Sequence, residues 1–175
     1  PAVISGAIAL IVIVSIWQAF SGFYPTYLIE VKEFSALRAS VLFGAFFALG
    51  VFIQPLSGMA YDSFGIRKTL TGFLGVFAVA MALLPVAERL WAVALITALA
   101  AALLGAPTTT QSHLLVILPE GTQGNALGML RTIAFTIGAA SPVIFGALAD
   151  NGLFDEGFTI LGALAVGALL AIRRL

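Results

Sequence analysis

Long apolar runs dominate the sequence and leave few polar residues with which to cover a soluble surface. Cutting the chain at its charged and Pro- or Gly-rich breaks gives six apolar segments, at about 2–29, 36–60, 69–86, 90–117, 125–149 and 156–172. A membrane-spanning helix needs about 20 mostly apolar residues, and the sustained alternation of a membrane β-strand is absent from the sequence. The sequence therefore predicts an all-α integral membrane protein, a bundle of six transmembrane helices.

Composition agrees with this prediction and excludes several function classes. Hydrophobic residues make up 61% of the chain and charged residues 9%, whereas soluble domains carry about 25% charged residues. Cysteine is absent and the one histidine, His113, has no acidic residue at helical spacing, so no metal site is predicted. No catalytic constellation or phosphate-binding loop stands out. We therefore expect a chain that is not an enzyme, with no cofactor and no nucleic-acid partner.

The distribution of basic residues predicts the orientation in the membrane. Cytoplasmic loops are enriched in Lys and Arg. If the chain starts inside, five basic residues fall on the inner side (Arg67, Lys68, Arg131, Arg173 and Arg174) and three on the outer side (Lys32, Arg38 and Arg89). Most acidic residues fall outside in the same arrangement. This count places both ends of the chain in the cytoplasm.

The second and fifth apolar segments end in the same way. In each, a glycine is followed four residues later by an aspartate and then by another glycine: Gly58, Asp62 and Gly65 in one, and Gly146, Asp150 and Gly152 in the other. Each pattern follows the middle helix of a predicted triplet. The sequence therefore predicts one unit, 1–175, made of two inverted three-helix repeats at about 1–87 and 88–175.

The stretch GMAYDSFGIRKTL, residues 58–70, gathers charges between two apolar segments. Gly58 is predicted to let helices approach closely, and Asp62 to meet a helix N-terminus or a cation. Gly65 is expected to permit a tight reversal, while Arg67 and Lys68 keep the loop in the cytoplasm. The plain alternative is a positively charged turn without a further role.

The spacing G-x-x-x-D-x-x-G-x-R-K from Gly58 to Lys68 resembles the signature loop of the major facilitator superfamily, which lies between the second and third helices of a six-helix half. The fifth segment reads GAASPVIFGALAD, and its Gly138, Pro142 and Gly146 recur every four residues, similar to the Gly/Pro-rich fifth and eleventh helices of that family. The resemblance extends over the whole chain.

This resemblance implies a carrier that works by alternating access, with a solute site near the bilayer midplane between two halves. Full members have twelve helices, so the chain matches one half. FYPTYL in the first segment, GALADNG after the fifth and the basic end look more like the C-terminal half. The implied partners are a small solute, the lipid bilayer and the missing six-helix half or a second copy, in the plasma membrane.

In that fold the first and fourth helices of each half line the cavity. The first segment carries a stripe of Trp17, Ser21 and Tyr24 with Gln18 beside it, and the fourth carries a stripe of Thr97, Thr108 and Gln111. These seven residues are the predicted substrate contacts. Their plain alternatives are interfacial aromatic residues and hydroxyl groups that bond to carbonyls one turn back.

Arg131 near the inner end of the fifth segment has two interpretations. It either extends to the interface or joins a cytoplasmic charge cluster with Glu120 or Asp62, in which Arg67 is another partner for Glu120. No Asp or Glu lies inside the six apolar segments, so the sequence shows no coupling carboxylate. The apolar cavity favours a neutral, lipophilic or weakly anionic solute over a cation.

Two other functions are consistent with the same amino-acid composition. A membrane scaffold that does not transport also needs only packed helices, although it has no need of a polar stripe facing a cavity. A half-size carrier that works as a homodimer would restore a two-half cavity by symmetry.

Overall fold

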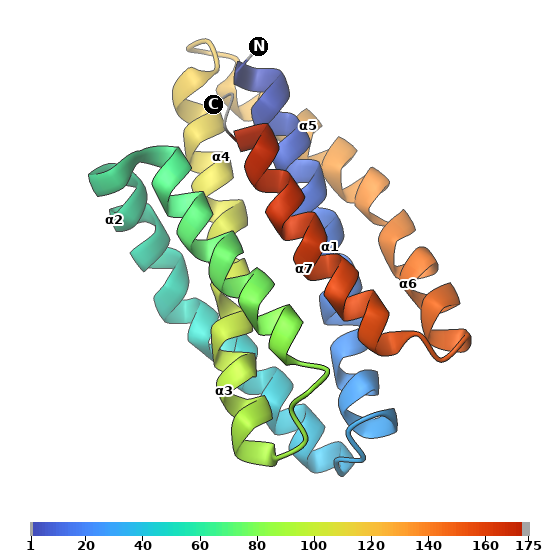
Figure 1. The fold of residues 1–175 in the computed structure, drawn as a ribbon. Coiled ribbons are helices and arrows are strands. Elements are labelled where there is room, and N and C mark those ends of the chain that lie inside the picture. The colour runs from blue at the N-terminus through green and yellow to red at the C-terminus, as the bar shows by residue number, and fades with distance from the viewer. Residues whose placement is uncertain (1, 173–175) are drawn as a thin grey trace.

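The computed structural model describes residues 2–172, and helices occupy most of that range (Figure 1). The elements are α1 (Ala2–Glu30), α2 (Ala36–Leu83), α3 (Leu90–Ala100), the 3-10 turn η1 (Ala101–Leu104), α4 (Gly105–Ile117), α5 (Gln123–Gly138), α6 (Ala140–Asp150) and α7 (Phe154–Ile172). No strand occurs between residues 2 and 172, which confirms the predicted all-helical class. Arg173 and Arg174, used to predict the orientation, lie outside the described residues.

The long element α2 consists of two helices joined at one residue. Gly65 has φ 75° and ψ 171° within otherwise helical backbone, and the chain doubles back there (Figure 1). Glycine adopts a positive φ without the steric cost that a Cβ would bring. The segment from Gly58 to Lys68, predicted as a loop, is helical on both sides of Gly65. That loop prediction was wrong because a single glycine is enough to reverse the chain.

Two prolines explain where the other long helices depart from regular α-helix. The stretches Leu90–Ile117 and Gln123–Asp150 are each 28 residues long. Pro107 follows η1, and Pro142 follows the junction of α5 and α6. Proline has no N–H to donate to the carbonyl four residues back, which for Pro142 is the carbonyl of Gly138. The Ser141 hydroxyl donates to that carbonyl at 2.7 Å and so supplies the missing hydrogen bond.

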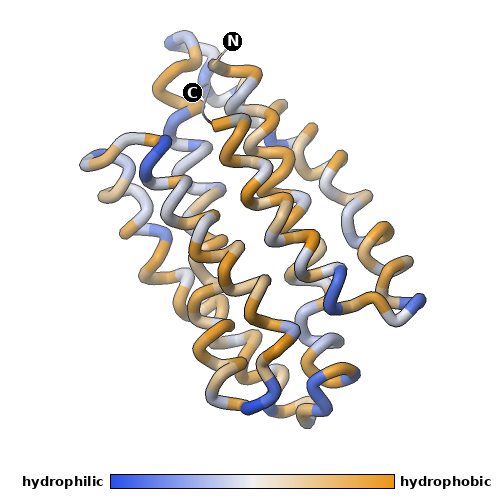
Figure 2. Tube along the Cα trace, in the orientation of Figure 1, coloured by the Kyte–Doolittle hydropathy of each residue, from blue (hydrophilic) through white to orange (hydrophobic). Residues whose placement is uncertain are grey.

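The outer surface of the bundle is suited to a membrane. Four stretches of the described chain are long and apolar enough to cross one by length and composition: Ala2–Glu30, Ala36–Leu83, Leu90–Ile117 and Gln123–Asp150. Hydrophilic residues gather at the turns, as Figure 2 shows. Large apolar side chains on α2 and α6, including Phe52 and Val143, are exposed. Such apolar surface is expected where lipid or another protein surface is the neighbour.

The core is centred on α1, which packs against α2, α4, α5, α6 and α7. Phe20 of α1 is fully buried, and its ring lies 4.7 Å from Tyr24, 5.0 Å from Phe46, 5.8 Å from Phe77 and 6.1 Å from Phe158, measured between ring centroids. Edge-to-face and stacked pairs at these separations are favourable. One aromatic cluster therefore joins α1 to α7 and to both arms of α2.

Glycines allow two helices to pack closely against α1. A Cβ placed on Gly138 of α5 would lie 2.5 Å from Gln18 Nε2 and 3.2 Å from Val14 Cγ1, and one on Gly146 of α6 would lie 3.2 Å from the Phe23 ring. Gly58 differs, since a Cβ there would meet no atom of the described residues within 4 Å. The close helix approach predicted at Gly58 is therefore absent within residues 2–172.

This contrast gives a matched pair of substitutions. We expect Gly138→Leu to lower the free energy of unfolding by about 1–3 kcal/mol, because the added side chain must push α5 away from α1. Gly58→Leu places the same side chain in open space and is expected to leave stability close to that of the parent. Thermal unfolding of the two detergent-purified variants measures the difference. Equal losses in both variants would contradict the packing described here.

Candidate functional site

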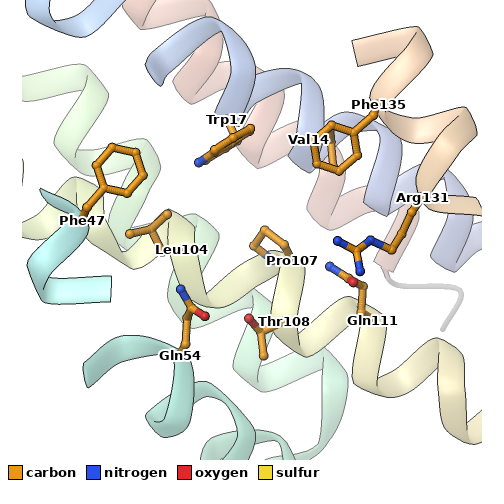
Figure 3. Close-up of a pocket in the computed structure, with 10 residues that line it drawn as sticks. All are labelled: Val14, Trp17, Phe47, Gln54, Leu104, Pro107, Thr108, Gln111, Arg131 and Phe135. Atoms are coloured by element: carbon orange, nitrogen blue, oxygen red, sulfur yellow. The ribbon is translucent and has the colours of Figure 1, made fainter. Parts of the chain in front are cut away.

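A cavity of about 280 Å³ lies between α1, α2, α4 and α5. Figure 3 shows the side chains that surround it. They are contributed by four helices and by η1: Val14 and Trp17 from α1, Phe47 and Gln54 from α2, Leu104 from η1, Pro107, Thr108 and Gln111 from α4, and Arg131 and Phe135 from α5. Apolar and aromatic walls with a few polar groups are typical of small-molecule sites.

The three consecutive threonines of α4 have different roles. Thr109 and Thr110 are fully buried and donate to the carbonyls of Gly105 and Ala106, at 3.0 and 2.9 Å. Thr108 is only partly buried and lines the cavity. Its hydroxyl has no hydrogen-bond partner among residues 2–172. The alternative that all three hydroxyls bond to carbonyls one turn back holds for Thr109 and Thr110 and not for Thr108.

Three further polar side chains face the same space. Gln54, Gln111 and Arg131 reach it from α2, α4 and α5, and the guanidinium of Arg131 lies on the same side of the cavity as the Gln111 amide (Figure 3). Within the part of the chain described, these three side chains form no hydrogen bond with protein. The cavity therefore presents donors and acceptors that remain available to a bound molecule or to water.

Four of the seven predicted substrate contacts lie elsewhere in this structure. Tyr24 and Thr97 are almost completely buried and hydrogen-bonded to each other, while the Thr97 hydroxyl also donates to the carbonyl of Val93 at 2.7 Å. Gln18 donates from Nε2 to the carbonyl of Phe135 at 3.2 Å, and Ser21 donates to the carbonyl of Gln18 at 3.4 Å. A substrate contact at these four positions stays a prediction.

The cavity does include the other three, Trp17, Thr108 and Gln111. It also includes Arg131, for which the sequence left two interpretations open, extension to the interface or a gating charge cluster. Gln54 and Phe47 were missed, because only the first and fourth helices were searched for cavity residues. One signal was present in the sequence, since Gln54 is a lone amide beside Pro55 in an apolar run.

Several of the predicted gating residues lie near helix ends or in turns. Asp62, Arg67, Lys68 and Glu120 are exposed. No Lys or Arg nitrogen lies within 4.0 Å of a carboxylate oxygen anywhere in the described chain, so Arg131 has no ion pair with Glu120 or Asp62 in this conformation. Asp150, at the end of α6, is exposed as well.

A polar cluster at one end of the bundle was not expected from the sequence. Lys32 donates from Nζ to the carbonyl of Pro85 at 2.7 Å and lies 5.3 Å from the ring centroid of Tyr27. The buried Tyr27 hydroxyl donates to Asp155 Oδ1 at 2.5 Å. Burial lowers the pKa of Lys32, whereas the carboxylates of Asp155 and Glu88 act in the opposite direction. These contacts fasten the end of α1 to the start of α7 and to the turn before α3.

Comparison with known families decides what kind of protein carries this cavity. The sequence model of the Major Facilitator Superfamily matches residues 6–175, nearly the whole chain. The chain belongs to the major facilitator superfamily. Members of this family are membrane transporters, which supports the same general function for this chain. Its apolar helices fit a multi-pass membrane protein. A search of curated proteins found no match.

Proposed function

We propose that this superfamily member is one half of a secondary carrier that moves a small solute by alternating access, with the solute bound in the cavity between α1, α2, α4 and α5. The observation that carries the proposal is a set of polar side chains around that cavity, Gln54, Thr108, Gln111 and Arg131, which have no hydrogen-bond partner among residues 2–172. Polar groups at membrane depth are costly and usually functional. A membrane scaffold has no requirement for them.

We also propose that the unit has six spans, with the two arms of α2 counted separately and α7 as the last, arranged as two inverted repeats. Two close contacts support the repeat. A Cβ on Gly50 would lie 2.6 Å from Leu104, and one on Gly138 would lie 2.5 Å from Gln18. In the first contact the second span meets the fourth, and in the second contact the fifth meets the first. If the two triplets are repeats, the first span corresponds to the fourth and the second to the fifth. The two contacts are therefore equivalent.

The reversals after the second and fifth spans provide further support. Gly65 has φ 75° and Gly152 has φ 76°. Each follows an exposed aspartate, Asp62 or Asp150, at the end of a helix. Two glycines with a positive φ at equivalent places are expected if each triplet descends from the same three-helix unit.

A second six-helix unit is proposed to cover the open side of the cavity. Our first choice is that this chain is the C-terminal half and that the other half belongs to the same carrier, and a second copy of the chain is the alternative. The start of α1, the end of α7 and the reversal within α2 lie at the same end of the bundle (Figure 1). This end is proposed to face the cytoplasm of a plasma-membrane carrier.

The charged residues at that end are proposed to act in gating. Asp62, Arg67, Lys68 and Glu120 are exposed and unpaired with one another in this conformation. They are therefore available for ion pairs across the boundary between two halves, which would break and form again as the halves rock. Gly138, Pro142 and Gly146 keep α5 and α6 close to α1 and permit the bend between them.

The test is an uptake experiment with the complete natural chain. Proteoliposomes that contain it are incubated with a mixture of small metabolites, and mass spectrometry compares their contents with those of protein-free liposomes. Enrichment of a specific solute, lost when Gln111 is replaced with leucine, is the expected result. If proteoliposomes with folded protein neither accumulate nor release any solute relative to protein-free liposomes, the proposal is overturned in favour of a scaffold.

A further inference from the structure

We propose that the solute is an organic carboxylate with an aromatic body, and that Arg131 binds its carboxylate. This inference rests on the proposed carrier function and names the chemical class that the same cavity selects. Three features of the cavity carry it: one unpaired cation, amide and hydroxyl groups beside it, and aromatic walls.

Charge is the first feature. Arg131 is the only charged side chain among the described residues that line the cavity. No carboxylate oxygen lies within 4.0 Å of its guanidinium within residues 2–172. A cation that lines a cavity of an apolar bundle is stabilised when an anion or a set of acceptors compensates it. The cavity therefore favours an anionic ligand, leaves the charge uncompensated around a neutral one and repels a cation.

Geometry is the second feature. A guanidinium presents a planar fork of N–H donors that matches both oxygens of a carboxylate. The Gln111 amide projects from α4 towards the guanidinium, which projects from α5 (Figure 3). Thr108 lies one turn before Gln111 on the same helix and lines the same cavity. A carboxylate held by Arg131 thus has additional neutral donors within the same wall.

The remaining walls set the shape of the rest of the solute. Trp17 and Phe135 pack edge to face, with ring centroids 6.2 Å apart. Phe47, which belongs to α2, contributes a third aromatic ring to the cavity wall. Val14, Leu104 and Pro107 complete an apolar lining. Aromatic rings prefer such edge-to-face and offset partners. A volume of about 280 Å³ is sufficient for a molecule built on one ring.

Three probes of nearly equal shape test this assignment: phenylacetate, its neutral amide phenylacetamide and the cation phenethylammonium. Saturation-transfer NMR on the complete natural chain in nanodiscs measures the affinity of each. We expect phenylacetate to bind about tenfold or more tightly than phenylacetamide, since a charge-assisted hydrogen-bond pair is replaced by a neutral one. Phenethylammonium is expected to bind more weakly than either.

The decisive variant is Arg131→Gln. It should abolish the preference for phenylacetate while phenylacetamide still binds, which shows that the cavity is folded. Arg131→Lys should keep part of the preference, because the charge remains but the planar fork is lost. Arg38→Gln, which removes an exposed arginine from the start of α2, is the matched control and should change neither affinity.

Several results would overturn the assignment. These are equal affinities for phenylacetate and phenylacetamide in the parent, a preference that survives in Arg131→Gln, or no binding of any probe. The first two are expected if Arg131 only extends to the lipid interface. Carboxylate binding that depends on Arg131, in a protein that transports nothing, would reject the carrier function and keep the anion site. Transport of neutral or cationic solutes alone would keep the carrier and reject the anion site.

Discussion

Phe20→Ala is expected to lower the free energy of unfolding by about 3–5 kcal/mol, the largest stability effect predicted for this chain. Phe20 is fully buried, and its ring contacts aromatic residues from α2 and α7 as well as α1. Truncation leaves a cavity where three helices meet, and surrounding side chains can refill it only in part. Thermal or SDS-induced unfolding of the purified protein measures the loss.

The matched control is Phe52→Ala. Phe52 lies on α2 and is 67% exposed, so its removal leaves no internal void. We expect its unfolding midpoint to remain near that of the parent. If the two variants lose similar stability, the aromatic cluster around Phe20 is not the centre of the fold.

Trp17→Ala is expected to produce the largest loss of function among the cavity walls. Trp17 lies partly buried in α1, lines the cavity and packs against Phe135. Removing a large aromatic anchor from a binding site commonly costs 2 kcal/mol or more, which corresponds to a loss of about thirtyfold in affinity. Initial uptake rates of the identified solute, measured over a range of concentrations, should show a raised KM.

The second tryptophan of the chain provides the control. Trp91 lies near the start of α3 and is 66% exposed. The Trp91→Ala variant should therefore transport the solute nearly as well as the parent does. Surface expression of both variants separates transport from insertion. Comparable KM values for Trp17→Ala and the parent would exclude this cavity as the solute site.

The sequence was sufficient to predict the all-helical class, because apolar runs of membrane length have few alternatives to a helix. It also located the reversal at Gly65, since charges and glycines interrupt the apolar pattern there. The sequence did not show that the helix continues through Asp62 up to Gly65. Charged residues suggest a loop, but whether the backbone stays helical depends on the single residue that takes a positive φ.

The cavity was predicted only in part, because a polar stripe on one helix does not show what covers it. Tyr24 and Thr97 fit their stripes but are buried against each other, a contact between residues 73 positions apart in the sequence. Thr108 and Thr109 are adjacent and chemically identical, yet only Thr108 lines the cavity. Side-chain spacing gives the face of a helix, and packing of the neighbouring helices decides which part of that face stays open.

Cysteine accessibility at the threonines of α4 tests most directly whether the cavity is open to water. Residues 1–175 contain no cysteine, so Thr108→Cys and Thr110→Cys each introduce one defined thiol into this part of the chain, and the parent protein provides the labelling background. A small, water-soluble methanethiosulfonate reagent is applied to each variant of the complete natural chain in membranes. We expect rapid labelling at position 108 and protection at position 110. A thiol at position 108 that resists labelling from both sides of the membrane would contradict this expectation.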